Sequence, residues 1–154
     1  MRERTRFFAD AMLGSLARWM RTLGCDVEYE SRISDGALIQ RALSEGRVVL
    51  TRDTLLAKRR ALMGRCLLVK GGLIQEQLRQ VAENFDLKDA GVLTRCLRCN
   101  RVLVDVEKAS VKGSVPEYVL MTQEKFSRCP ACKRVYWGGT HRDKMRKELS
   151  KLLG

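Results

Sequence analysis

The segment Val48-Val49-Leu50-Thr51-Arg52-Asp53 is a short apolar run that ends in an aspartate, and Phe7-Phe8-Ala9-Asp10 repeats this arrangement earlier in the chain. Strands that are buried on both faces of a parallel sheet have such short apolar runs. The carboxyl ends of parallel strands meet at one edge of the sheet, where α/β proteins bind their ligands. The two segments therefore predict parallel strands that bring Asp10 and Asp53 to one sheet edge. A third acid, Asp35, lies at the expected start of a helix.

Carboxylates gathered at one sheet edge repel one another unless a cation lies between them. Carboxylate oxygens are also the ligands that Mg²⁺ and Mn²⁺ prefer. We therefore predict Asp10, Asp35 and Asp53 as metal ligands and catalytic residues. Helix capping is an alternative, because Asp53 opens an expected helix and Asp35 lies near a cap. Capping explains each aspartate singly but not the joint placement with Asp10.

Strand and helix signals alternate through the first part of the chain. Apolar runs predict strands at residues 6–9, 27–29, 48–50 and 66–69. Apolar positions at helical spacing predict helices at residues 12–23, 37–43, 54–63 and 73–84, with Ser34 as a cap and Gly24 and Gly46 as stops. This alternation is typical of an α/β fold with a parallel sheet flanked by helices.

The character of the sequence changes after residues 86–89, where cysteines, basic residues and β-branched segments replace the alternation. We predict two domains, an α/β domain at residues 1–90 and a smaller β-rich unit at residues 91–154. Of the net charge of +12, the first domain contributes +4 (16 Lys and Arg against 12 Asp and Glu) and the second +8 (14 against 6). This concentration favours a polyanion partner. A solvated basic surface explains the charge alone equally well.

The second unit contains two C-x₂-C pairs, Cys96/Cys99 and Cys129/Cys132, with 29 residues between them. A tight turn in each pair directs both sulfurs the same way, so the pairs can hold one tetrahedral Zn²⁺. Asn100 and Lys133, which follow the second cysteine of each pair, are compatible with such a turn. A structural zinc ribbon is favoured over two alternatives. Disulfides are unusual in a cytosolic protein, and a redox C-x₂-C pair is expected near a βαβ unit rather than in this basic segment.

Further elements are expected around these cysteines. Residues 101–104 and 118–120 are predicted to be hairpin strands of the ribbon. Residues 142–153 are predicted to form an amphipathic helix with basic residues on its outer side and with three apolar residues on its docked face: Met145, Leu149 and Leu152.

Composition excludes some classes of protein. The chain of 154 residues, 45% hydrophobic and 31% charged, has the balance of a soluble globular protein. It lacks an apolar stretch of about 18 residues, the length of a membrane span, so no membrane partner is expected. Glu3 and Asp10 interrupt the arginine-rich start, which we expect to enter the first strand rather than act as a leader. A cytoplasmic location is the default expectation.

His141 is the single histidine of the chain, which argues against mechanisms that need a histidine general base. A structural or RNA-contacting role is favoured over metal ligation. The neighbouring Tyr136 and Trp137 either stack on bases, since aromatic faces accept any base, or pack the core of the ribbon.

These motifs together resemble the Mut-seven C-terminal RNase family, in which a PIN-like domain precedes a zinc ribbon. The resemblance covers essentially the whole chain. The stretches that match are residues 8–21 (Phe8-Ala9-Asp10-Ala11-Met12-Leu13-Gly14-Ser15-Leu16-Ala17-Arg18-Trp19-Met20-Arg21), Leu50-Thr51-Arg52-Asp53, the two cysteine pairs and Tyr136-Trp137-Gly138-Gly139-Thr140-His141.

The resemblance implies a PIN-like parallel sheet and a metal-dependent ribonuclease, expected to be endonucleolytic, with Mg²⁺ or Mn²⁺ at the acids and Zn²⁺ at the cysteines. Asp10 and Asp53 are the strongest ligands by motif, and Asp35 is the third. PIN nucleases commonly use four acids, and no motif identifies a fourth one here; the candidates are Asp26, Glu28, Glu30 and Glu76.

The expected partner is RNA, with tRNA, rRNA and mRNA equally open. Thr51 is expected to orient an acid or water, and the arginines either bind the scissile phosphate or pair with the acids. The predicted RNA-binding residues are Arg18, Thr51, Arg52, Trp137 and His141. The alternatives are a non-catalytic RNA-binding or ribosome-associated module, or the toxin of a toxin–antitoxin pair.

Overall fold

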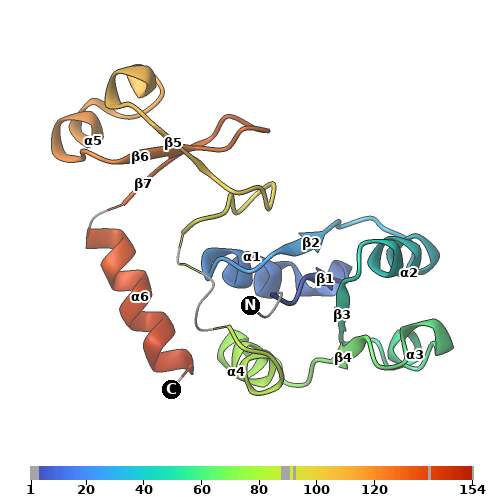
Figure 1. Ribbon diagram of the computed structural model, residues 1–154. Helices are drawn as coiled ribbons and strands as arrows, with labels where there is room; N and C mark the ends of the chain where they lie inside the picture. Colours follow the sequence, from blue (N-terminus) through green and yellow to red (C-terminus); the bar gives the residue numbers. More distant parts are fainter. Residues whose placement is uncertain (1–3, 88–90, 92, 139, 154) are drawn as a thin grey trace.

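The computed structural model describes residues 4–87, 91, 93–138 and 140–153 (Figure 1). The first part of the chain forms a parallel four-stranded sheet in the order β2-β1-β3-β4. Its strands are β1 (Phe7–Ala9), β2 (Val27–Tyr29), β3 (Val48–Thr51) and β4 (Cys66–Leu68). Its helices are η1 (Ala11–Leu13), α1 (Gly14–Thr22), α2 (Asp35–Ser44), α3 (Thr54–Ala57), η2 (Arg60–Leu62) and α4 (Ile74–Asn84).

The second part contains a three-stranded antiparallel sheet in the order β5-β6-β7. Its elements are β5 (Val104–Val106), η3 (Lys108–Val111), α5 (Glu117–Thr122), β6 (Phe126–Arg128), β7 (Val135–Trp137) and α6 (Thr140–Leu153). The predicted fold class, a parallel sheet flanked by helices and followed by a small β-rich unit and a C-terminal helix, is confirmed.

Helices cover both faces of the parallel sheet because side chains alternate along each strand. Phe7 and Ala9 of β1 point to one face, where they pack with α1 and α4. Phe8 points to the other face, where it packs with Leu38 of α2 and Leu56 of α3. The central strands are therefore buried on both sides, which is why they read as continuous apolar runs.

The strand order places the carboxyl ends of β1 and β3 at a topological switch point. From β1 the chain moves outward to β2, and then returns to β3 on the other side of β1. Such a reversal opens a crevice at the carboxyl edge, where α/β proteins bind ligands. Ala9 pairs with Leu50 in this register, so Asp10 and Thr51 follow side by side.

Two predicted elements differ from the structure. The helix predicted at residues 54–63 is divided into α3 and η2. Leu56 and Leu62 are both buried in one core cluster. Residues six apart lie roughly 120° apart around a continuous helix, so the break lets both reach the sheet.

The prediction of a strand at residues 118–120 is wrong, because these residues lie in α5. Pro116 precedes the first turn, where proline is tolerated, and Glu117 suits the positive end of a helix. Val119 then faces the small core while Tyr118 stays exposed. The strand predicted at 101–104 begins only at Val104, and β6 and β7 complete the sheet instead.

Helix α6 returns to the first part of the molecule. Leu149 is buried in the same cluster as β1 and α1, and α6 packs beside α4 (Figure 1). The predicted docking of this helix is confirmed for Leu149, whereas the side chains of Met145 and Leu152 lie outside the described residues. The exposed side of α6 is basic and includes Lys144, Arg146, Lys147 and Lys151.

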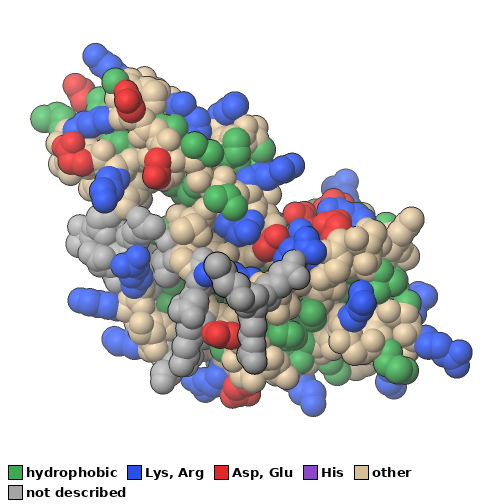
Figure 2. All heavy atoms as spheres, viewed as in Figure 1, with side chains coloured by type: hydrophobic (Ala, Val, Ile, Leu, Met, Phe, Trp, Pro, Cys, Tyr) green, Lys and Arg blue, Asp and Glu red, His purple; other side chains and the backbone are tan. Residues whose placement is uncertain are grey.

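The expected domain boundary lies between residues 90 and 91. The neighbouring residues 88–90 and 92 are outside the described part of the chain. Lys and Arg side chains are spread over both parts of the molecule on the face in Figure 2, with acidic side chains between them. None of the described helices is long and apolar enough to cross a membrane.

Candidate functional site

Asp10 is held at the end of β1 by bonds on both of its carboxylate oxygens. Its backbone N–H donates to the carbonyl of Leu50 at 2.9 Å, which continues the pairing with β3. Its Oδ1 accepts from the backbone N–H of Met12 at 2.9 Å and so caps η1. Its Oδ2 accepts a short hydrogen bond from the hydroxyl of Thr51. The side chain is therefore fixed, and the residue is only 7% exposed.

Asp53 lies on the other side of Thr51. The Thr51 Oγ1 accepts from the backbone N–H of Asp53 at 2.9 Å while its proton goes to Asp10. The Asp53 Oδ1 caps α3 by accepting from Leu55 and Leu56 at 2.9 and 3.3 Å. Its Oδ2 accepts no hydrogen bond from the residues that the structure describes, so this oxygen is available as a ligand.

Asp35 lies at the same sheet edge but outside this hydrogen-bonded pair. It is the exposed first residue of α2, and the cap is Ser34, whose hydroxyl accepts from Ala37 at 3.2 Å. Within the described ranges, the four cysteines are the one group of three or more metal-ligating side chains close enough together to hold an ion. The structure thus links Asp10 and Asp53 through Thr51, and none of the hydrogen bonds among the described residues links Asp35 to them.

Of the candidates for a fourth acid, Asp26, Glu28 and Glu30 are engaged by arginines, whereas Glu76 is exposed and forms no ion pair among the described residues. Asp26 pairs with Arg47 at 2.7 Å; burial opposes its ionisation, but hydrogen bonds from Arg47 and Asn100 hold the pKa of Asp26 below its ordinary value. Glu28 and Glu30 both contact Arg41. Glu76 packs against Gly71 at the start of α4.

Arg18 and Arg52, by contrast, are exposed, and neither forms an ion pair within the part of the chain that the structure describes. Pairing with the acids is therefore not what occupies these guanidinium groups. Both remain able to bind a phosphate through the planar fork of an arginine. Thr51 is fully buried, so its contribution is to hold the acids.

The two cysteine pairs form matching turns. Asn100 and Lys133 have positive φ angles of 63° and 65°, as the turn requires. The N–H of Asn100 donates to Cys96 O at 2.9 Å, and that of Lys133 donates to Cys129 O at 2.9 Å. In each turn the N–H of the second cysteine also points at the sulfur of the first, at 3.4 and 3.5 Å.

The sulfurs fit one tetrahedral ion. The four Sγ atoms lie within 4.8 Å of one another, and those of Cys96 and Cys132 are 3.7 Å apart. Thiolates bound at about 2.3 Å to one tetrahedral zinc ion lie about 3.8 Å apart. All four thiols are free, and this separation is too long for a disulfide of about 2.05 Å.

Tyr136 supports this cluster through its hydroxyl, a role that neither alternative of the sequence analysis, base stacking or packing of the ribbon core, included. Its hydroxyl accepts from the N–H of Leu97 at 3.1 Å and lies 3.2 Å from the sulfur of Cys96. Burial raises the pKa of Cys96, but the hydrogen bonds from Tyr136 and backbone N–H groups outweigh it and lower the value to about 7. Burial and the neighbouring sulfurs raise the pKa of Cys99 to about 12.

The first cysteine turn is anchored to the parallel sheet and α1, whereas among the described residues the second turn forms no such contacts. Arg21 donates to the carbonyls of Leu97 and Arg98 at 2.9 and 3.3 Å. The side chain of Asn100 accepts from the N–H of Val27 at 3.0 Å. Its amide also donates to the carboxylates of Asp26 and Glu28, at 2.7 and 3.2 Å.

We expect Asn100→Ala to lower the free energy of unfolding more than Lys133→Ala does, by about 1.5–3 kcal/mol. Both substitutions put alanine at a positive φ, so Lys133→Ala is the control for backbone strain. The difference reports the three side-chain bonds of Asn100 together with the smaller preference of asparagine over lysine for a positive φ. Urea denaturation of the zinc-loaded variants measures it, and equal losses of stability would show that these bonds do not anchor the turn.

Trp137 ends β7 and is 39% exposed. The backbone of His141 lies in α6, and its side chain is outside the described residues.

Comparison with known proteins agrees with this arrangement. The model of the Mut7-C RNase domain family matches residues 5–149. A human protein named exonuclease mut-7 homolog is 36% identical over 101 residues, which are 62% of this chain and 12% of that protein. The chain therefore spans a small part of the length of this relative. No solved structure matches the chain.

Proposed function

Since the chain belongs to the Mut7-C RNase domain family, we propose that it hydrolyses RNA phosphodiester bonds at the carboxyl edge of its parallel sheet, with Asp10 and Asp53 as the central acids. The observation that carries this proposal is the Asp10–Thr51–Asp53 arrangement at the switch point between β1 and β3. Hydrogen bonds fix both acids before any ligand arrives. Such fixing is what a catalytic site requires of its supporting residues.

The carboxylates suit a hard divalent cation, Mg²⁺ or Mn²⁺. Each Asp10 oxygen accepts one bond and keeps one lone pair, and Asp53 Oδ2 keeps both, whereas Asp53 Oδ1 already accepts two bonds. Asp35, on the first turn of α2, is the proposed third acid from the same edge. Bound there, the cation would lower the pKa of a coordinated water so that it attacks at neutral pH.

The remaining steps fall to residues of the chain itself. Thr51 fixes the orientation of Asp10, because its single proton is committed to Oδ2. Arg52, between Thr51 and Asp53, is proposed to bind the scissile phosphate, and Arg18 is proposed to bind a neighbouring one. No histidine is assigned to proton transfer, because the side chain of His141, the single histidine, lies outside the described residues.

The four cysteines are proposed to hold one Zn²⁺ with a structural role. Four protein thiolates close the coordination sphere, so the ion has no open position for substrate. We propose residues 91–154 as the unit that this ion stabilises and residues 1–90 as the nuclease domain.

The test is cleavage of a circular single-stranded RNA by the zinc-loaded protein after dialysis into buffer without other divalent ions. We expect no cleavage before Mg²⁺ or Mn²⁺ is added and linear products afterwards. Dialysis avoids a chelator that would also remove zinc. A circle has no ends, so its cleavage demonstrates an endonuclease. A linear RNA of the same sequence is the second substrate. Cleavage of the linear RNA but not of the circle would show an exonuclease, the activity named for the human relative.

A non-catalytic RNA-binding module is the second candidate. The observation in its favour is that Asp10 and Asp53 both cap helices, and that the three aspartates form no ligand cluster among the residues described. Binding of RNA without cleavage under any divalent ion tested would support this candidate.

A further inference from the structure

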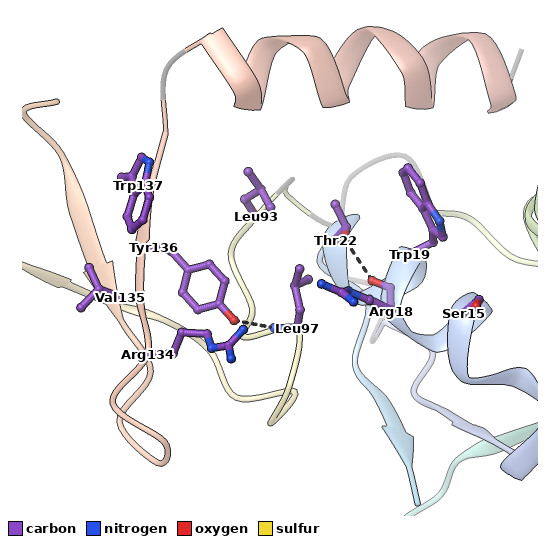
Figure 3. Close-up of a pocket in the computed structure, with 10 residues that line it drawn as sticks. All are labelled: Ser15, Arg18, Trp19, Thr22, Leu93, Leu97, Arg134, Val135, Tyr136 and Trp137. Atoms are coloured by element: carbon purple, nitrogen blue, oxygen red, sulfur yellow. Dashed lines mark hydrogen bonds between the residues drawn. The ribbon is translucent and has the colours of Figure 1, made fainter. Parts of the chain in front are cut away.

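A cleft of about 660 Å³ lies between α1 and β7, and none of the three predicted catalytic aspartates is among its lining residues (Figure 3). One wall is helix α1, with Ser15, Arg18 and Trp19. The other wall is β7, with Tyr136 and Trp137, and the residue before it, Arg134. Residues more than a hundred positions apart in the sequence therefore form one concave surface.

Both walls of the cleft combine an aromatic ring with an arginine. Trp19 and Trp137 are the two tryptophans of the chain, and Figure 3 shows them on opposite sides of the cleft. Arg18 and Arg134 are exposed, and neither forms an ion pair among the residues that the structure describes. Aromatic faces that accept bases, together with cations that accept phosphates, are the two components of single-strand binding sites.

The cleft is also aligned with the acidic edge. Helix α1 starts just after Asp10 and η1. Ser15, Arg18 and Thr22 line the cleft at successive turns of this helix, over roughly 10 Å at 1.5 Å per residue. A single-stranded nucleic acid that follows this row of side chains from β7 would reach the start of α1, which follows Asp10 and η1 in the chain.

We infer that this cleft binds single-stranded RNA, with bases stacked on Trp19 and Trp137 and phosphates paired with Arg18 and Arg134, and that α1 leads the strand toward the acids. The inference rests on the proposed ribonuclease function and adds the form of the substrate. A duplex does not fit, because its bases are already stacked and hide their faces. An apolar protein segment is not favoured, because both walls present an unpaired cation.

The experiment measures binding of a fluorescein-labelled 12-nucleotide oligouridylate to the Asp10→Asn form of the 154-residue chain, so that the RNA stays intact. We expect Trp137→Ala to weaken binding roughly 5- to 100-fold, the range found for loss of one base–aromatic stack. Arg18→Ala and Arg134→Ala should each reduce the slope of log K against log salt by about 0.7. Arg79→Ala, an exposed arginine on α4, is the matched control and should leave affinity unchanged.

Intrinsic fluorescence reports directly on the cleft because both tryptophans line it. Trp19→Phe leaves Trp137 as the sole emitter, and Trp137→Phe leaves Trp19. We expect oligouridylate to quench both single-tryptophan proteins and a blunt RNA duplex to quench neither. The deoxyuridine oligonucleotide tests whether the 2′-hydroxyl contributes. Zinc content and circular dichroism confirm that each variant is folded.

Wild-type affinity in the folded Trp137 and Arg18 variants, or equal quenching by the duplex, would overturn the inference. These outcomes are separate from failure of the proposed function. If oligouridylate quenches the wild-type protein but the protein never cleaves RNA, the cleft inference stands and the proposed nuclease function is wrong. If the protein cleaves RNA and the cleft variants bind and cleave as the wild type does, only the cleft inference is wrong.

Discussion

Cys129→Ser is expected to unfold the β5-β6-β7 unit while the parallel sheet stays folded. The described core of that unit has three buried hydrophobic residues, Val111, Val119 and Phe126. So small a core does not hold a structure by itself, and small domains of this kind depend on a metal. Structural zinc contributes about 10–16 kcal/mol in apparent binding free energy, which exceeds the stability of most domains.

Hydrogen exchange measured along the chain tests this expectation. Protection should disappear from β6 and β7 and persist in β1 and β3. Cys66→Ser, a partly buried cysteine outside the cluster, is the control and should keep both the zinc and the protection of β6. Loss of protection in β1 together with β6 would contradict the proposed division at residue 90.

Cys96→Ser is expected to have a wider effect than Cys129→Ser, because the two cysteine turns are not equivalent. The Cys96 turn presents Asn100 to the backbone of Val27 and receives Arg21 from α1. Its collapse should therefore also reduce protection in β2. Identical exchange patterns for the two serine variants would mean that the contacts with β2 survive without the metal.

The parts of the fold that the sequence predicts correctly depend on local patterns. β1 and β3 are short apolar runs, Ser34 caps α2, and Gly24 and Gly46 adopt positive φ at the ends of α1 and α2. Adjacency of Asp10 and Thr51 follows, because parallel strands align their carboxyl ends. Each of these features needs only a few neighbouring residues.

The parts that the sequence does not reveal depend on distant contacts. The β-branched and aromatic run around Val119 has strand propensity, but it forms a helix whose Val119 side chain packs in the core of the small unit. The position of Asp35 relative to the other acids depends on the path of the loop before α2, for which the sequence shows no pattern. The cleft needs α1 and β7 to meet, so only the folded chain reveals that Trp19 and Trp137 share a surface.

Asp10→Asn is expected to lower the rate of RNA cleavage by at least roughly 100- to 1,000-fold without unfolding the protein. A catalytic cation contributes several kcal/mol of transition-state stabilisation, and each 1.36 kcal/mol is about tenfold in rate. Asparagine removes the charge that would hold the cation. RNA affinity should be unchanged or higher, since a negative charge is lost near a polyanion.

The structure explains why the fold should tolerate this substitution. Asparagine caps helices as well as aspartate does, so Oδ1 can still accept from Met12. The amide can donate to the Thr51 hydroxyl, which has two acceptor lone pairs and already accepts from Asp53. Thr51→Val, which removes the hydroxyl but keeps the shape, should lose roughly 10- to 100-fold, the usual effect of removing a group that orients a metal ligand.

Single-turnover cleavage in Mn²⁺, beside thermal melting, measures both expectations. Glu83→Gln, an exposed acid on α4, is the matched control and should cleave at the wild-type rate. A uniform decline in all three variants would point to lost stability rather than lost chemistry. A wild-type rate for Asp10→Asn would mean that Asp10 only caps η1. Its bond to Thr51 would then have no part in catalysis, and the proposed site at the switch point would be wrong.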